Sequence, residues 1–170
     1  MHGLTLVKTD PMEHSHQQMQ AHGNHYQKLI LMVVLSFASM YILMYAMVDR
    51  MENVFPNVNQ FYMAGLMTCP MVVIEIALMS MMYNNRRLNI AIVAVAVVAL
   101  TSFYFAIRQQ TGVGDRQFLR SMIPHHSSAI LMCESANIKD PEIKKLCSEI
   151  VSGQQKEIDL MKAKLHELKN

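Results

Sequence analysis

Residues 29–48 read LILMVVLSFASMYILMYAMV, a run of 20 residues without a charged side chain. An α-helix rises about 1.5 Å per residue, so about 20 residues cross the ~30 Å hydrocarbon core of a bilayer. Residues 61–83 and 88–107 form two further runs of this kind, and Glu75 is their single charged residue. The sequence therefore predicts three transmembrane helices within residues 28–108. Three buried helices of a soluble protein are the alternative, but too little polar chain remains to cover them.

The charges flanking these runs suggest an orientation. Three crossings place the N-terminal tail, residues 1–27, on the same side as the short turn that carries Arg86 and Arg87. The C-terminal region, residues 112–170, then lies on the opposite side. Arginines in a short turn favour the cytoplasmic side of a membrane. We expect an integral protein of the inner (plasma) membrane, with a cytoplasmic tail and a periplasmic or otherwise external C-terminal domain.

The tail itself is polar and lacks an apolar period, so it is expected to be largely disordered. Its soft and borderline ligands could collect metal ions weakly, and a merely solvated tail is an equal alternative. These candidate ligands are His14, His16, Met19, His22 and His25.

Residues 112–170 predict two helices that fold back on each other as an antiparallel hairpin. Asp140-Pro141 is a strong start for the second helix, with Asp as the cap and Pro at the first helical position. Side chains then recur at alternating steps of four and three residues, the spacing of a coiled-coil seam: Cys147, Val151, Gln154, Ile158, Met161, Leu165 and Leu168. One hairpin buries little apolar surface, so two copies are expected to pair as a four-helix bundle.

The adjacent pair His125-His126 lies in the first hairpin helix, near Met122 and level with Gln154 of the second helix, which Glu157 flanks. Neighbouring residues point about 100° apart on a helix, so one ring is expected to face the seam and the other a neighbouring chain. Imidazole suits copper and zinc, and thioether selects Cu(I). The pattern indicates a metal site; a Met-filled core beside a solvated histidine pair is the alternative.

The hairpin also resembles the domain-of-unknown-function 305 family. The motifs that carry the resemblance are Asp115-x-x-Phe118, Met122-Ile123-x-His125-His126-x-x-Ala129-Ile130-x-Met132 and Ile150-x-x-x-Gln154-x-x-Glu157-Ile158-x-x-Met161. The resemblance implies a ferritin-like helical fold and copper binding. The ligand region that it implies comprises Met122, His125, His126, Met132, Gln154, Glu157 and Met161.

The apolar half contains a further set of candidate ligands, Cys69, Met71 and Glu75, in its second predicted helix. A carboxyl group there is expected to be protonated, paired or facing a cavity, because a charge in the membrane is costly. Together with the many methionines of the first two helices, this set suggests a Cu(I) conduit. Methionine as a flexible packing residue is the favoured alternative.

Cys133 and Cys147 lie about three residues out of register across the predicted hairpin, so the sequence leaves a disulfide between them open.

The function expected from these features is copper binding by an all-α membrane protein, with lipid and further copies of itself as partners. A membrane-anchored interaction protein without a metal is the second hypothesis, and the Cu(I) conduit is the third. The sequence contains no nucleophile–base pair, cofactor motif or long basic run. We therefore expect neither an enzyme nor a nucleic-acid-binding protein.

Overall fold

The computed structural model describes the backbone of residues 11–168 and the side chains of residues 25–168. The described residues form five α-helices and two short 3-10 turns, without a strand, which confirms the all-α prediction. The α-helices are α1 (Pro11–Leu43), α2 (Val58–Leu78), α3 (Arg86–Arg108), α4 (Asp115–Ser135) and α5 (Pro141–Glu167), and the turns are η1 (Met44–Met47) and η2 (Met51–Asn53).

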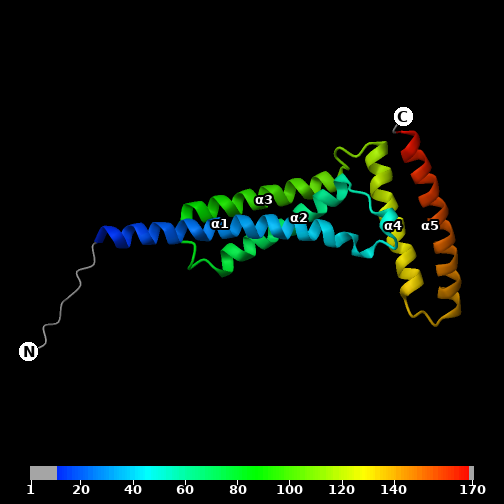
Figure 1. The fold of residues 1–170 in the computed structure, drawn as a ribbon, viewed down its shortest axis with the longest axis horizontal. Coiled ribbons are helices and arrows are strands. Elements are labelled where there is room, and N and C mark those ends of the chain that lie inside the picture. Colours follow the sequence, from blue (N-terminus) through cyan, green and yellow to red (C-terminus); the bar gives the residue numbers. More distant parts are fainter. Residues whose placement is uncertain (1–10, 169–170) are drawn as a thin grey trace, which may run out of the picture.

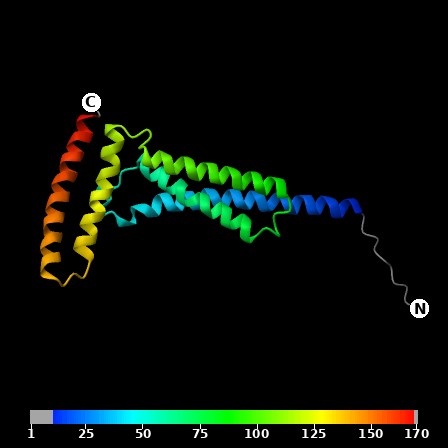
Figure 2. The ribbon, with the colours of Figure 1, turned by 180° about the vertical axis from the view of Figure 1, so that it is seen from behind.

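Three stretches are long and apolar enough to cross a membrane, namely His25–Met47, Val58–Leu78 and Arg86–Arg108. The helices that contain them run alongside one another, and the α4–α5 hairpin lies across their end (Figures 1 and 2). Within the hairpin, α4 lies nearer to the three long helices and α5 lies on its far side. Many apolar side chains of α1 and α3 stay exposed on the outside of this unit, as lipid-facing side chains would be.

Close approach of α2 and α3 depends on a glycine. A Cβ atom at Gly65 would lie 2.5 Å from the Phe103 ring, nearer than real Cβ atoms come to another group. The missing side chain therefore lets an aromatic ring of α3 pack directly on the α2 backbone, which is how small residues bring membrane helices together. Asn57 and Asn85 cap the starts of α2 and α3 by accepting hydrogen bonds from the backbone N–H groups of Gln60 and Leu88.

The N-terminal tail differs from its prediction. Helix α1 begins at Pro11, so residues 11–27 are helical where the sequence predicts a largely disordered segment. Proline with a preceding Asp is a typical helix start, and Gln17-Gln18-Met19-Gln20-Ala21 is a run of good helix formers continuous with the apolar helix. Residues 1–10 lie outside the described residues.

Helix α2 ends at Leu78, five residues before the end of the predicted span. Glu75 therefore lies in its last turn, not near the middle of the membrane as the sequence predicts. The Glu75 carboxylate accepts a hydrogen bond from the Tyr83 hydroxyl at 3.4 Å. A charge so close to the helix end can reach the aqueous interface, which lowers its cost.

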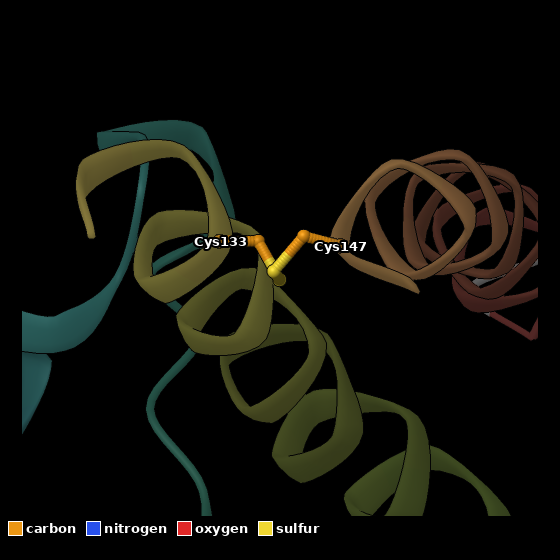
Figure 3. The surroundings of a disulfide bond; sticks show 2 residues. All are labelled: Cys133 and Cys147. Atoms are coloured by element: carbon orange, nitrogen blue, oxygen red, sulfur yellow. A yellow bond between two sulfur atoms is a disulfide. The ribbon is translucent and has the colours of Figure 1, made fainter. Parts of the chain in front are cut away.

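The hairpin forms as predicted, and a disulfide closes its tip (Figure 3). The Asp140 carboxylate accepts hydrogen bonds from the N–H groups of Glu142 and Ile143 and so caps α5. Cys133 and Cys147 lie directly opposite each other, with their Cα atoms 5.2 Å apart and 14 residues of separation. Their midpoint is residue 140, two residues beyond Ile138, near which the sequence predicts the turn, and this shift brings the two thiols into register.

The hairpin core lies between the helices on the side of α4 that faces α5. It consists of Ile123, Ile130, Ile158, Met161 and Leu165. The last three belong to the predicted seam, whereas Leu168 remains about half exposed. Phe55, from the loop between α1 and α2, also packs against this core. The loop therefore belongs structurally to the hairpin as well as to the three long helices.

A buried carboxylate joins that loop to α4. The Asp49 side chain is 4% exposed. Its backbone N–H donates to Ser127 Oγ at 2.9 Å, and the Ser127 hydroxyl donates back to the Asp49 carboxylate. Asn53 Nδ2 donates to the same carboxylate at 2.7 Å. Burial raises the pKa of Asp49, but the hydrogen bonds from Ser127, Asn53 and the Arg50 backbone, with the Arg50 charge, outweigh it and hold this pKa below its usual value.

We expect Ser127→Ala to loosen this contact by about 1–3 kcal/mol, because it leaves the Asp49 backbone N–H without its partner and removes one of the hydrogen bonds to the buried carboxylate. Hydrogen exchange of the amides of residues 49–57 in the full chain measures the effect. Ser128→Ala is the matched control, since the Ser128 hydroxyl donates within α4 to the His125 carbonyl. Equal exchange in the two variants would show that the Asp49–Ser127 contact does not hold the loop.

The same contact has a defined pH dependence. The pKa of the Asp49 carboxyl is lower in the folded chain than in the unfolded chain, where it is about 3.9. Ionised Asp49 therefore stabilises this contact fully at a pH above the unfolded pKa, and the stabilisation is lost as the pH falls through the folded pKa. Protection of residues 49–57 should therefore be constant near neutrality and fall only in acid. Asp49→Asn should remove this acid-dependent loss.

Candidate metal site

His126 points from α4 toward α5 and is nearly buried. Its Nδ1 lies 2.8 Å from the Met122 carbonyl oxygen, one helical turn earlier. Its Nε2 lies 2.8 Å from Oε2 of Glu157 on α5. Both ring nitrogens therefore face oxygen atoms, and Nε2 has a carboxylate directly beside it.

This pair needs little movement to hold a metal ion. Two ligands held at the ~2.0–2.1 Å typical of nitrogen and oxygen donors, at a tetrahedral angle, lie about 3.3 Å apart. His126 and Glu157 are within roughly 0.5 Å of that separation. The hydrogen bond from Nδ1 to a carbonyl oxygen fixes the ring so that Nε2 faces outward, as in many protein metal sites.

Two methionines of the hairpin core are candidates for further ligands beside this pair. Met161 is buried in the hairpin core and Met122 packs against it. Gln154, three residues before Glu157, is half-buried and level with His126 in the register set by the disulfide. Among the described residues, no three His, Cys, Asp or Glu side chains converge. The donors therefore fit a mixed imidazole, carboxylate and thioether site better than a structural zinc site.

Met132 is not brought to this pair. It lies six residues beyond His126, about 9 Å along the helix, and is 54% exposed. Of the region implied by the family resemblance, the structure joins His126 to Glu157 and to the Met122 carbonyl, packs Met122 against Met161, and leaves out Met132.

His125 diverges from His126, as helix geometry requires, and their ring centroids are 5.9 Å apart. It lines a cavity of about 260 Å³ between α4 and the ends of the long helices. Three methionines line the same cavity: Met44, Met47 and Met63. We call these four residues the junction set. The second ring is exposed and lines a cavity beside the chain's own long helices, and its predicted contact with a neighbouring chain stays a prediction.

Those secondary candidates whose side chains the structure describes do not form one site. The side chains of His14, His16, Met19 and His22 lie outside the described residues. The His25 ring lies edge-on to Tyr83, with centroids 6.5 Å apart. Cys69 is buried and lines an apolar cavity between α2 and α3. Met71 and Glu75 are one turn apart on α2, but Cys69 is two residues before Met71 and therefore points about 200° away from it.

Sequence patterns did not predict the contact between Asp49 and Ser127. Asp49 follows an apolar run and Ser127 follows the histidine pair, yet 78 residues separate them and nothing in their local sequence signals the contact. The methionines of the junction set could be identified as candidate ligands from the sequence, since they belong to the methionine-rich predicted spans. Their meeting with His125 depends on how the hairpin lies across the helices.

The described residues define this chain as an all-α protein with three long apolar helices and a C-terminal hairpin. Residues 105–165 match the family described as "Domain of unknown function (DUF305)". "Uncharacterized protein L153" of Acanthamoeba polyphaga mimivirus is 34% identical over 144 residues, which cover 83% of this chain and 93% of that protein. The chain therefore belongs to the DUF305 family. No solved structure matches it.

Proposed function

We propose that this protein is a membrane-anchored copper-binding protein that serves copper homeostasis. The observation that carries the proposal is the divergence of two adjacent imidazoles toward two sets of soft or borderline donors. His126 faces Glu157 beside Met122 and Met161. His125 shares a cavity with the three methionines of the junction set.

The chemistry of the two sets favours copper among the common metals. Thioethers select Cu(I) over zinc, magnesium and calcium, and imidazole binds both copper oxidation states. The junction set contains only neutral, soft or borderline ligands and so suits a monovalent ion. The carboxylate beside His126 also suits Cu(II). A bound copper ion would supply a redox-active centre.

Copper binding is tested with the full chain in a neutral detergent, by competition for Cu(I) against a chromophoric chelator. We expect His126→Ala and Glu157→Gln each to remove one bound equivalent, and His125→Ala to remove a different one. Met51→Ala is the control, because Met51 is 85% exposed and belongs to neither set.

Unchanged copper binding in the double variant His125→Ala with His126→Ala would overturn this assignment. It would favour the second hypothesis, a helical interaction protein without a metal. The Cu(I) conduit has weaker support, because Cys69 and Glu75 do not share a face of α2.

An external hairpin is part of the proposal. The Cys133–Cys147 disulfide supports it, because disulfides persist in oxidising compartments such as the bacterial periplasm and are rare in the cytosol. The Arg86-Arg87 turn supports the same orientation. The three long helices would then cross the plasma membrane with α1 starting on the cytoplasmic side.

This topology predicts that protease added to spheroplasts cleaves the hairpin while an N-terminal epitope tag stays intact. Detection of both ends by immunoblotting gives the result. Cleavage of the hairpin only after the membrane is broken would place it inside the cell and contradict the orientation.

Pairing of two hairpins into a ferritin-like four-helix bundle is also proposed. Apolar side chains on both hairpin helices remain about half exposed: Phe118, Met132, Ile143 and Leu146. Leu146 and Glu157 are three turns apart on one face of α5. A second hairpin covering that face would enclose the His126–Glu157 pair in the bundle interior, where ferritin-like folds hold their metals.

The pairing predicts that the wild-type chain sediments as a dimer and that Leu146→Asp shifts it toward the monomer, because a buried carboxylate in the interface lacks a partner. Ser152→Asp, at an exposed position on another face of α5, should leave the dimer intact. Monomeric wild-type protein would contradict the bundle.

A further inference from the structure

A further cavity lies at the end of the hairpin that is opposite to the disulfide. There the start of α4 and the end of α5 lie side by side (Figures 1 and 2). The cavity has a volume of about 330 Å³ and is lined by Arg116 and Arg120 from α4, by Lys162, Leu165 and His166 from α5, and by Phe55 from the loop. Arg116 and Arg120 are one helical turn apart on α4, and Lys162 and His166 are one turn apart on α5. Each helix therefore presents two basic side chains to the same cavity. We call it the basic pocket.

The cations of the basic pocket lack counter-charges. The ion pairs among the described residues join Arg50 to Asp49, His126 to Glu157 and Lys164 to Glu167, and none involves Arg116, Arg120 or Lys162. No described Asp or Glu side chain lines the pocket.

Arg120 carries a further sign of a missing partner. Its Nε is buried from solvent and has no hydrogen-bond partner. A buried donor of a charged group that stays unpaired costs several times the gain from an ordinary hydrogen bond. Like charges that converge in a partly buried pocket also repel one another. An anion that accepts hydrogen bonds from several sides would relieve both costs.

We propose that the basic pocket binds a phosphate group. Guanidinium groups donate in a planar fork that matches two phosphate oxygens, and Lys162 adds a mobile point charge for a third. The wall formed by Phe55 and Leu165 gives the site an apolar side, which suits a phosphate attached to an organic group. This site is separate from the proposed copper ligands and does not depend on them.

The position of the pocket points to the headgroup of a phospholipid as the source of the phosphate. Arg116 follows the last residue of the third long helix, Arg108, by only eight residues, and α4 lies directly across the ends of those helices. Basic side chains at that level meet the phosphates of anionic lipids. A small phosphorylated solute is the other source of the same chemistry.

The test uses the full chain in a neutral detergent and has two arms. One measures binding of phosphatidylglycerol by native mass spectrometry, with phosphatidylcholine as the comparison lipid. The other measures binding of inorganic phosphate by titration calorimetry. Arg116→Gln with Arg120→Gln should weaken binding by at least ~10-fold, because it removes two charge-assisted donors. Lys139→Gln with Lys145→Gln makes the same change in net charge at the opposite end of the hairpin and should leave the affinity unchanged.

Variant-dependent binding in the lipid arm assigns the pocket to a headgroup, and variant-dependent binding in the phosphate arm alone assigns it to a solute. Equal weakening by both double variants would mean that only the overall charge matters and would overturn the site. Absence of binding in both arms would overturn it as well. Lys162→Gln alone should also weaken binding, which keeps the test valid if the double arginine variant folds poorly.

Discussion

The buried Asp49 carboxylate is the contact on which the arrangement of the two halves depends. It fixes the loop after the first long helix to Ser127 in the middle of α4, and so holds the hairpin across the ends of the helices. Three features lie around this attachment. His125 lines one cavity with Met44, Met47 and Met63, and Phe55 both packs on the hairpin core and lines one side of the basic pocket. The side chains that form each site are on separate elements, and the loop brings them together.

Local physics explains what could be predicted from the sequence. Apolar runs of membrane length, the Asp140-Pro141 helix start and the seam of α5 each depend on neighbouring residues only, and the structure follows them. Divergence of His125 from His126 also follows from helix geometry alone. What each ring faces does not, because that depends on contacts such as Asp49 with Ser127 across 78 residues. The disulfide illustrates the same limit, since a shift of two residues in the turn decides whether Cys133 meets Cys147.

The hairpin has three chemically different parts along its length. Its tip is closed by a covalent bond, its middle carries imidazole and thioether donors, and its opposite end gathers four basic side chains. α4 contributes to all three because it lies between the long helices and α5 (Figure 1). A single amphipathic helix thereby links the surface of the apolar unit to the pair that is proposed to bind copper.

The disulfide at the tip also makes the hairpin a lever with a fixed pivot. Any spreading of α4 from α5 must rotate about Cys133 and Cys147, so the displacement grows with distance from that bond. His126 lies seven residues from the pivot, about 10 Å, and Arg116 lies 17 residues away, about 25 Å. A given opening angle therefore moves the basic end roughly two and a half times as far as the His126–Glu157 pair. A ligand that binds at the basic end and changes the separation of α4 and α5 there would therefore change the His126–Glu157 separation by a smaller amount.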